Sequence, residues 1–303
     1  MHSRPALGYA MVAVAATLFA VNASIVKVIE HTGIDAQRLT QVRSTGAFAG
    51  LALIVLASRP ALARATRREL ALLVALGVGG LALVQWSYFF AIHRLPIGEV
   101  LLIQYIAPLL VALWARFVFH ERVRSRIWIA LGLCLAGLVL VVRLWDAGRI
   151  DGVGIAVSGL TCLSYAFYVL MAERRVRERD PISLLAWGFL FSTFFWAVVL
   201  PWWSFPLHRF EGETSLLGRL ASWHAPLWLL VSSIVVLGTI VPFVLIVGAL
   251  RHLGATRVAI VAMLEPAVAI VVAWAWLGES FEAPQVAGIA VTLGGIVVAQ
   301  TAR

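Results

Sequence analysis

The sequence is poor in charge. Charged residues make up 13% of its 303 residues, lysine occurs once, at Lys27, and the residue types AVILMFWYC account for 62%. A water-soluble domain carries about 25% charged residues, because its surface must face water. Disordered chains lack the Trp, Phe and Leu that are plentiful here. The composition therefore excludes both classes and indicates an integral membrane protein.

Catalytic, metal-binding and nucleotide-binding motifs are also missing. The two cysteines, Cys134 and Cys162, lie in apolar runs without CxxC or metal-ligand spacing, so we interpret them as small packing residues. No GxxxxGK or GxSxG motif occurs, and the segment starting His120-Glu121 has Arg124 where an HExxH site needs its second histidine. We expect no enzyme activity, ATP-driven pumping, metal or cofactor.

The net charge of +9 does not indicate a nucleic-acid-binding protein, because the arginines form short clusters between long apolar runs. About 20 apolar residues cross the hydrocarbon core of a bilayer as a helix. Ten runs fit this length. The predicted spans are Gly8–Ile29, Leu39–Ala57, Leu70–Ile92, Ile97–Phe119, Ile127–Val142, Val153–Ala172, Ser183–Trp203, Leu227–Leu250, Thr256–Leu277 and Pro284–Gln300.

The basic residues predict the orientation of these spans. With the N-terminus inside, the cytoplasmic segments carry fifteen of the 24 basic residues and the outside loops carry five. Cytoplasmic loops are enriched in Lys and Arg, so the bias predicts the inside face. Because it recurs in every second loop, it supports an even number of spans and places both termini in the cytoplasm.

An internal repeat appears when the chain is shifted by 158 residues. Three pairs of landmarks then coincide: Pro108 with Pro266, Glu121 with Glu279 and Gly137 with Gly295. Each half holds five predicted spans, and an odd number places the second half upside down in the membrane. Inverted repeats are typical of transporters, with a substrate site near the midplane between the halves. We expect an all-α integral membrane protein with ten transmembrane helices, arranged as two inverted five-helix repeats, 1–148 and 149–303, around a central cavity.

The same landmarks carry a family resemblance over nearly the whole chain. The residues are Gln104-Tyr105-Ile106-Ala107-Pro108 and His120-Glu121 in the first half, and Leu264-Glu265-Pro266-Ala267-Val268 and Leu277-Gly278-Glu279 in the second. This pattern resembles the EamA-type family of the drug/metabolite transporter superfamily, and within it the bacterial aromatic amino-acid exporters of the YddG type. The resemblance implies export of amino acids or related metabolites across the bacterial inner (plasma) membrane.

Polar groups inside a bilayer are costly and usually face the bundle interior. On the sixth span, Ser158, Thr161, Tyr165 and Tyr168 follow helical spacing and form one polar stripe. Such stripes either line a ligand pocket or bond the backbone and neighbouring helices. We expect an aromatic-walled substrate pocket, with Phe19 near it, whose candidate residues are Asn22, Gln85, Tyr88, Gln104, Tyr105, Tyr165, Tyr168, Thr239 and Phe243.

Two charged residues inside predicted spans need a separate explanation. Glu265 is the only carboxylate near the middle of a span, and burial disfavours its charged form. It is therefore a candidate proton carrier or partner for a cationic substrate group, unless it only packs helices. Arg43 either pairs with Glu99, binds a substrate carboxylate or extends to the interface.

Several other residues have structural interpretations. We expect Lys27 at the interface, and Glu121 and Glu279 as caps of the following helices. Gly46 and Gly50, like the small residues of the last span, let helices pack closely within or between subunits. Those last-span residues are Ala287, Gly288, Gly294 and Gly295. The interface anchors are Trp202, Trp203, Trp223 and Trp228.

The sequence therefore predicts a secondary transporter that works by alternating access, with neutral and especially aromatic amino acids as substrates. The alternatives are a broad metabolite or drug exporter and a passive, channel-like facilitator, although no filter motif occurs. Saturable flux and counterflow distinguish a carrier from a pore. The expected partners are the small-molecule substrate and membrane lipid, not nucleic acid, and the expected state is a monomer or weak homodimer.

Overall fold

The computed structural model describes residues 4–58, 60–120, 123–144, 151–205, 210–280 and 282–301. In this part of the chain, ten helices are long and apolar enough to cross a membrane, and each overlaps one predicted span. The ten-span all-helical prediction is thus confirmed. Six spans are single helices, namely α1 (Pro5–Glu30), α2 (Ala36–Ser58), α7 (Ser125–Val142), α8 (Gly152–Val176), α9 (Pro181–Val199) and α14 (Ala283–Thr301).

The other four spans are composite, whereas the sequence predicted unbroken runs. The third joins α3 (Arg67–Val74), the π-helix η2 (Ala75–Ala82) and α4 (Leu83–Ile92), and the fourth joins α5 (Ile97–Gln104) and α6 (Ala107–Phe117). The eighth joins α10 (Leu227–Val235), the π-helix η7 (Val236–Ile240) and α11 (Val241–Leu253). The ninth joins α12 (Ala255–Ala262), α13 (Leu264–Val272) and the π-helix η8 (Ala273–Leu277).

Two prolines explain the breaks in the fourth and ninth spans. Proline has no backbone N–H and its ring clashes with the carbonyl four residues earlier. For Pro108 that carbonyl belongs to Gln104, where α5 ends, and for Pro266 it belongs to Ala262, where α12 ends. The two breaks are 158 residues apart, the offset of the sequence repeat.

The two π-helices of the third and eighth spans follow the same offset. The segment η2 ends at Ala82 and η7 ends at Ile240, again 158 residues apart. π-turns inside longer helices occur frequently at functional sites. The repeat is therefore visible in helix geometry as well as in sequence, and it directs attention to these irregular turns.

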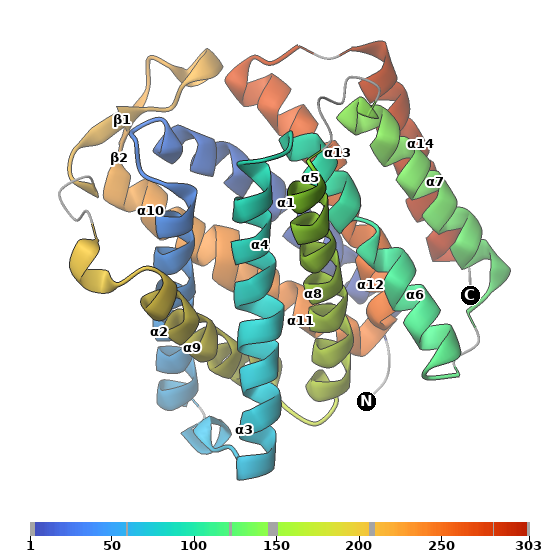
Figure 1. Ribbon diagram of the computed structural model, residues 1–303, viewed down its shortest axis with the longest axis horizontal. Coiled ribbons are helices and arrows are strands. Elements are labelled where there is room, and N and C mark those ends of the chain that lie inside the picture. The colour runs from blue at the N-terminus through green and yellow to red at the C-terminus, as the bar shows by residue number, and fades with distance from the viewer. Residues whose placement is uncertain are drawn as a thin grey trace.

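The first helix of each half packs mainly on the other half. Helix α1 packs on α11, α12 and α13, and α8 packs on α4, α5 and α6. Helices α7 and α14 lie side by side at the edge of the bundle, green and red in Figure 1. Helix α1 begins and α14 ends toward the lower side of this view, whereas the hairpin of β1 (Glu213–Ser215) and β2 (His224–Pro226) covers the upper side.

Glycines allow several close helix contacts within the chain. A Cβ atom added to Gly295 would lie 2.7 Å from Cys134 Sγ, and one on Gly137 would lie 2.3 Å from Thr292 Oγ1. On α2, a Cβ on Gly46 would meet Val235 at 2.8 Å. The predicted packing role is therefore confirmed within one chain for Gly46, Gly50, Gly288 and Gly295. It is wrong for Gly294, whose added Cβ would meet nothing within 4 Å, and for Ala287, which is exposed.

The seventh span ends earlier than predicted. Helix α9 stops at Val199 because Pro201 follows, and residues before a proline avoid the helical conformation. Trp202 and Trp203 instead lie in the short 3₁₀ turn η4 (Trp202–Ser204), and the Trp203 side chain is 89% exposed. Trp223 and Trp228 are exposed too, as expected of residues at a lipid–water boundary.

Candidate functional site

The site starts with Arg43, which reaches from α2 to the π-turn of the eighth span. Its Nε donates to Thr239 Oγ1 at 2.9 Å, and its Nη2 donates to the carbonyl of Gly238 at 3.1 Å. That carbonyl is available because Pro242, four residues later, has no N–H to donate. Arg43 thus points into the middle of the bundle and, within the described residues, forms no ion pair with Glu99.

Glu265 lies at the start of α13, beside the break in the ninth span. Its carboxylate interacts with the hydroxyl of Tyr105, which sits at the corresponding break of the fourth span. Arg43, Tyr88 and Tyr165 are also within electrostatic range of this carboxylate. Four residues predicted from sequence, contributed by both halves, therefore lie within electrostatic range of Glu265.

Several of these side chains are only partly buried. Arg43, Tyr88, Tyr165 and Glu265 are surrounded by protein, yet part of each remains accessible to solvent. A side chain that faces lipid would be accessible without being enclosed. We interpret the combination as an internal polar space at the junction of the broken helices.

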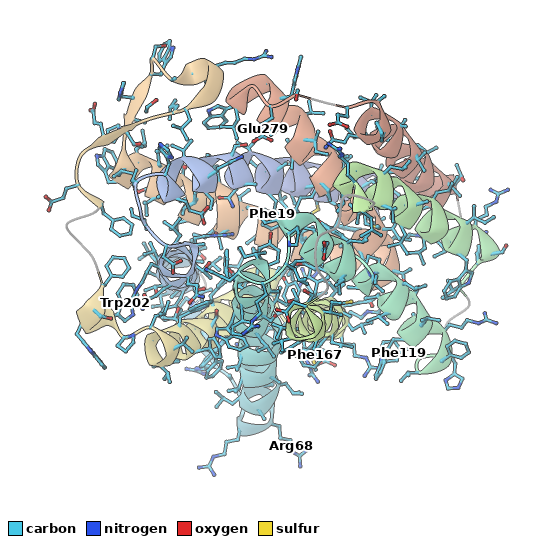
Figure 2. All side chains as sticks on the ribbon, turned by 45° about the horizontal axis from the view of Figure 1, so that its top comes forward. Phe19, Arg68, Phe119, Phe167, Trp202 and Glu279 are labelled. Atoms are coloured by element: carbon cyan, nitrogen blue, oxygen red, sulfur yellow. The ribbon has the colours of Figure 1, made fainter. Side chains whose placement is uncertain are left out.

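An aromatic cluster lies beside this space. Phe243 on α11 contacts Phe19, Tyr168 and Phe189 edge-on, with ring centroids 5.5, 6.0 and 5.3 Å away. Figure 2 shows Phe19 near the centre of the bundle. Phe189 was not predicted, because it stands in a run of α9 where every neighbour is apolar or aromatic and nothing in the sequence distinguishes it.

Asn22 and Tyr168 each leave a polar atom without a partner. Asn22 packs against Gly238, where an added Cβ would lie 2.0 Å from Asn22 Oδ1. Within the described residues, neither Asn22 Oδ1 nor the Tyr168 hydroxyl forms a hydrogen bond, although both are buried. Buried polar atoms are nearly always paired, so these two are candidates to bind a polar group of a substrate.

Of the remaining predicted residues, two hydroxyl residues are hydrogen-bonded and two glutamines are partly accessible. Ser158 donates to the carbonyl of Gly154 in its own helix at 2.8 Å, and Thr161 donates to Ser87 Oγ of the third span at 2.8 Å, so these two residues of the sixth-span stripe bond the backbone and a neighbouring helix. Gln85 is partly accessible and donates to Leu81 O in its own helix at 3.2 Å. Gln104 is partly accessible at the end of α5.

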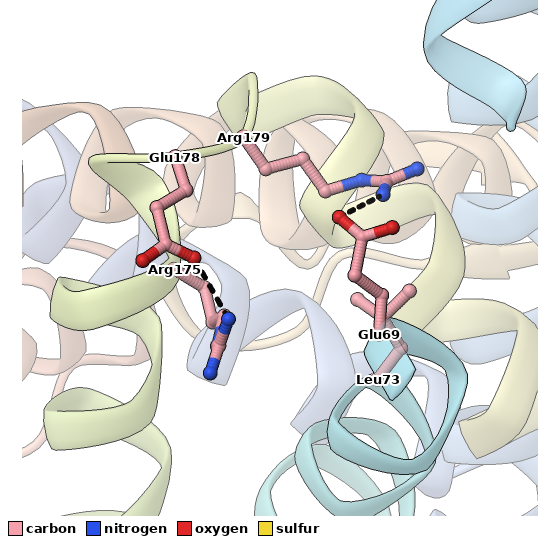
Figure 3. Close-up of a pocket in the computed structure, with 5 residues that line it drawn as sticks. All are labelled: Glu69, Leu73, Arg175, Glu178 and Arg179. Carbon is pink, nitrogen blue, oxygen red and sulfur yellow. Dashed lines mark hydrogen bonds and ion pairs between the residues drawn. The ribbon is translucent and has the colours of Figure 1, made fainter. Parts of the chain in front are cut away.

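Arg179 connects the two halves at one end of the bundle. It donates to the carbonyls of Leu62 and Arg64 at 2.9 and 2.8 Å, and to Ser183 Oγ at 3.0 Å. Figure 3 shows its ion pair with Glu69, 3.5 Å long. Burial lowers the pKa of Arg179, an effect that Glu69 opposes. These bonds compensate a half-buried charge and tie the loop after α2 to the α8–α9 connection.

Ion pairs also connect the halves at the other end. Glu279 pairs with Lys27, so it does not act as the helix cap that we expected. Arg94 pairs with Asp151 at 3.1 Å, and this hydrogen bond lowers the pKa of Asp151. Both partners are solvent-exposed, so each pair contributes little stability. Glu121 lies outside the described residues.

Comparison with known proteins identifies the family. The model described as "EamA-like transporter family" matches residues 6–143 and again residues 152–301. An uncharacterized transporter of Archaeoglobus fulgidus is 28% identical over 216 residues, which cover 70% of each chain. The threonine/homoserine exporter RhtA of Escherichia coli K12 is 23% identical over 71% of this chain and 65% of its own length, slightly less than two thirds.

A solved crystal structure of a protein has the same fold, with a TM-score of 0.77 over 99% of this chain and 100% of that chain, at 18% sequence identity. An uncharacterized transporter of Pseudomonas aeruginosa is 26% identical over 80% of this chain and 76% of its own length. The family resemblance seen in the sequence is confirmed. With two family matches that together span almost the whole chain, the protein belongs to the EamA-like transporter family of membrane transporters.

Proposed function

We propose that this protein is a secondary transporter that exports neutral amino acids, aromatic ones in particular, or related small metabolites from the bacterial cytoplasm. The observation that carries this proposal is that Arg43 and Glu265, which come from different halves of the chain, affect each other electrostatically and are both partly accessible. The aromatic cluster around Phe243 lies next to it. RhtA, a relative, is named as an exporter of two amino acids.

Each candidate residue has a role in this proposal. Tyr88, Tyr105, Tyr165, Tyr168 and Phe243 form the aromatic wall against which an apolar side chain packs. Arg43 and Glu265 supply the only two fixed charges among the candidates. The polar groups that orient the substrate are Asn22, Gln85, Gln104 and Thr239.

We further propose that residues 1–148 and 149–303 move against each other in alternating access, without ATP. The proposal is supported by the reciprocal packing of α1 and α8 on the opposite halves. It is also supported by polar contacts between the halves at both ends, around Arg179 and between Lys27 and Glu279. Breaking the contacts at one end while those at the other end persist would open the site to one side of the membrane only.

For the cell, we propose an inner-membrane protein with both termini in the cytoplasm, as a monomer or weak homodimer in lipid. The distribution of arginines between alternate loops supports this orientation. Arg68 lies at the end of the bundle opposite Glu279 in Figure 2, in line with that assignment.

The test is counterflow of labelled phenylalanine in proteoliposomes. We expect saturable accumulation driven by exchange, and lower rates in Tyr165→Ala and Tyr168→Ala at equal protein content. Phe167→Ala is the matched control, because Phe167 lies between the tyrosines on α8 but is 36% exposed. Wild-type rates in both tyrosine variants would overturn the proposed site. Flux without saturation or counterflow would favour a passive facilitator, and equal competition by unrelated drugs would favour a broad exporter.

A further inference from the structure

Two unlike charges lie close together without pairing. Arg43 and Glu265 affect each other electrostatically, yet within the described residues no ion pair joins them at 4 Å or less. Removing a charge from water is costly, and a buried ion normally recovers that cost from a direct partner. Because neither charge is neutralised by the other, each can bind an opposite charge on a third molecule.

Arg43 is held so that one edge of its guanidinium is engaged and another is free. Nε and Nη2 are bound by Thr239 and Gly238 of the π-turn. Within the part of the chain that the structure describes, no group accepts a hydrogen bond from the third nitrogen, Nη1. A guanidinium fixed in this way presents a preorganised donor to a carboxylate, which is its preferred anionic partner.

Glu265 offers the complementary charge on the other side of the space. Its immediate neighbour is the hydroxyl of Tyr105, a neutral donor, and its side chain remains partly accessible. A carboxylate is an acceptor only, so its free capacity suits an ammonium group. The two sides of the space thus favour opposite charges on one small molecule.

We propose that Arg43 binds the α-carboxylate and Glu265 binds the α-ammonium group of a zwitterionic α-amino acid. This inference rests on the proposed function, because it assigns the substrate class of the same site. The two charged groups of the substrate are then bound by residues from opposite halves of the chain, while its side chain extends toward Phe243. A molecule with only one of the two charges leaves one buried ion unpaired.

The test is competition against labelled phenylalanine in proteoliposomes containing the wild-type protein. The competitors are phenylalaninamide, which lacks the carboxylate, and 3-phenylpropanoate, which lacks the ammonium group. We expect each to compete roughly 10-fold or more weakly than phenylalanine, the ratio that follows from losing one charge-assisted hydrogen bond. Equal competition by either analogue overturns the inference while leaving amino-acid export intact. Absence of any amino-acid flux instead overturns the proposed function, and this inference with it.

Variants assign each charge to its residue. Arg43→Gln should abolish the preference for phenylalanine over its amide but keep the preference over 3-phenylpropanoate, and Glu265→Gln should do the reverse. Compared with Arg43→Gln, Arg43→Lys should restore part of the preference for phenylalanine over its amide, since a cation remains. Loss of both preferences in both variants would contradict the assignment. If a variant fails to fold in detergent, the wild-type competition still decides the inference.

Discussion

The carbonyl of Gly238 accepts a hydrogen bond from Arg43 Nη2 at 3.1 Å, in the middle of a membrane-spanning helix. Regular helices leave no carbonyl free at this depth, because each accepts from the N–H four residues later. Here that residue is Pro242. A proline in one half of the chain therefore positions a charge contributed by the other half.

Replacing this proline should uncouple stability from function. In Pro242→Ala, a new N–H competes with Arg43 for the Gly238 carbonyl, so we expect the apparent KM for substrate to rise several-fold. Thermal stability in detergent should hold or increase, because proline costs about 3 kcal/mol in a helix interior. Pro284→Ala is the control, since Pro284 lies in the first turn of α14, where a backbone N–H would have no helical acceptor and its absence costs nothing. An unchanged KM in Pro242→Ala would show that substrate binding does not depend on the hydrogen bond between Arg43 and the Gly238 carbonyl.

The contact between Asn22 and Gly238 should tolerate no added methyl group. In Gly238→Ala, the new Cβ would lie 2.0 Å from Asn22 Oδ1, so α1 must move away from the π-turn. We expect lower transport and a loss of about 1–3 kcal/mol of stability, the usual range for overpacking. Adding Asn22→Ala should recover much of that stability. Gly132→Ala, whose Cβ meets nothing within 4 Å, is the control and should match the wild type.

The packing of α7 on α14 should affect stability but not substrate recognition. In Gly295→Ala the added Cβ would lie 2.9 Å from the carbonyl of Ala130 and 2.7 Å from Cys134 Sγ. We expect a lower Tm and an unchanged KM. Gly294→Ala changes the neighbouring residue, whose Cβ would meet nothing within 4 Å, and should leave Tm unaltered. Equal Tm values for the two variants would contradict the close packing described above.

Arg179 should be needed for the contact between the halves at its end of the bundle. Arg179→Gln removes donors to two backbone carbonyls and leaves Glu69 without its ion-pair partner. We expect a destabilisation of about 1–3 kcal/mol, as for buried polar groups left unpaired. Arg68→Gln is the control, because Arg68 is exposed and points away from the bundle (Figure 2). The readout is thermal unfolding in detergent. Equal shifts in Tm for the two variants would contradict a stabilising role for the hydrogen bonds and ion pair of Arg179.

Sequence reasoning succeeded where a single chemical pattern determines the structure. Apolar length determines the spans, and the repeated motifs around Pro108 and Pro266 carry the family resemblance. The fourth and ninth spans were predicted as unbroken, so the helix breaks that the two prolines explain were missed. Sequence reasoning also failed for contacts between distant segments. The partners of Arg43 could not be predicted, because they lie on a helix of the other half, 195 and 196 residues away, and periodicity does not show which helices pack together. Phe189 was missed because it has only apolar and aromatic neighbours in sequence.

The most direct test of the account is labelling of a cysteine placed beside the polar space. Gln104→Cys puts a thiol at the break of the fourth span, where the native side chain is partly accessible. The native thiols, Cys134 and Cys162, are buried, so the wild type reports the background. We predict that a membrane-impermeant thiol reagent labels this position from either side of the membrane and that phenylalanine slows labelling from both. Labelling from one side only under every condition, or labelling that substrate does not slow, would contradict an alternately accessible site between the halves.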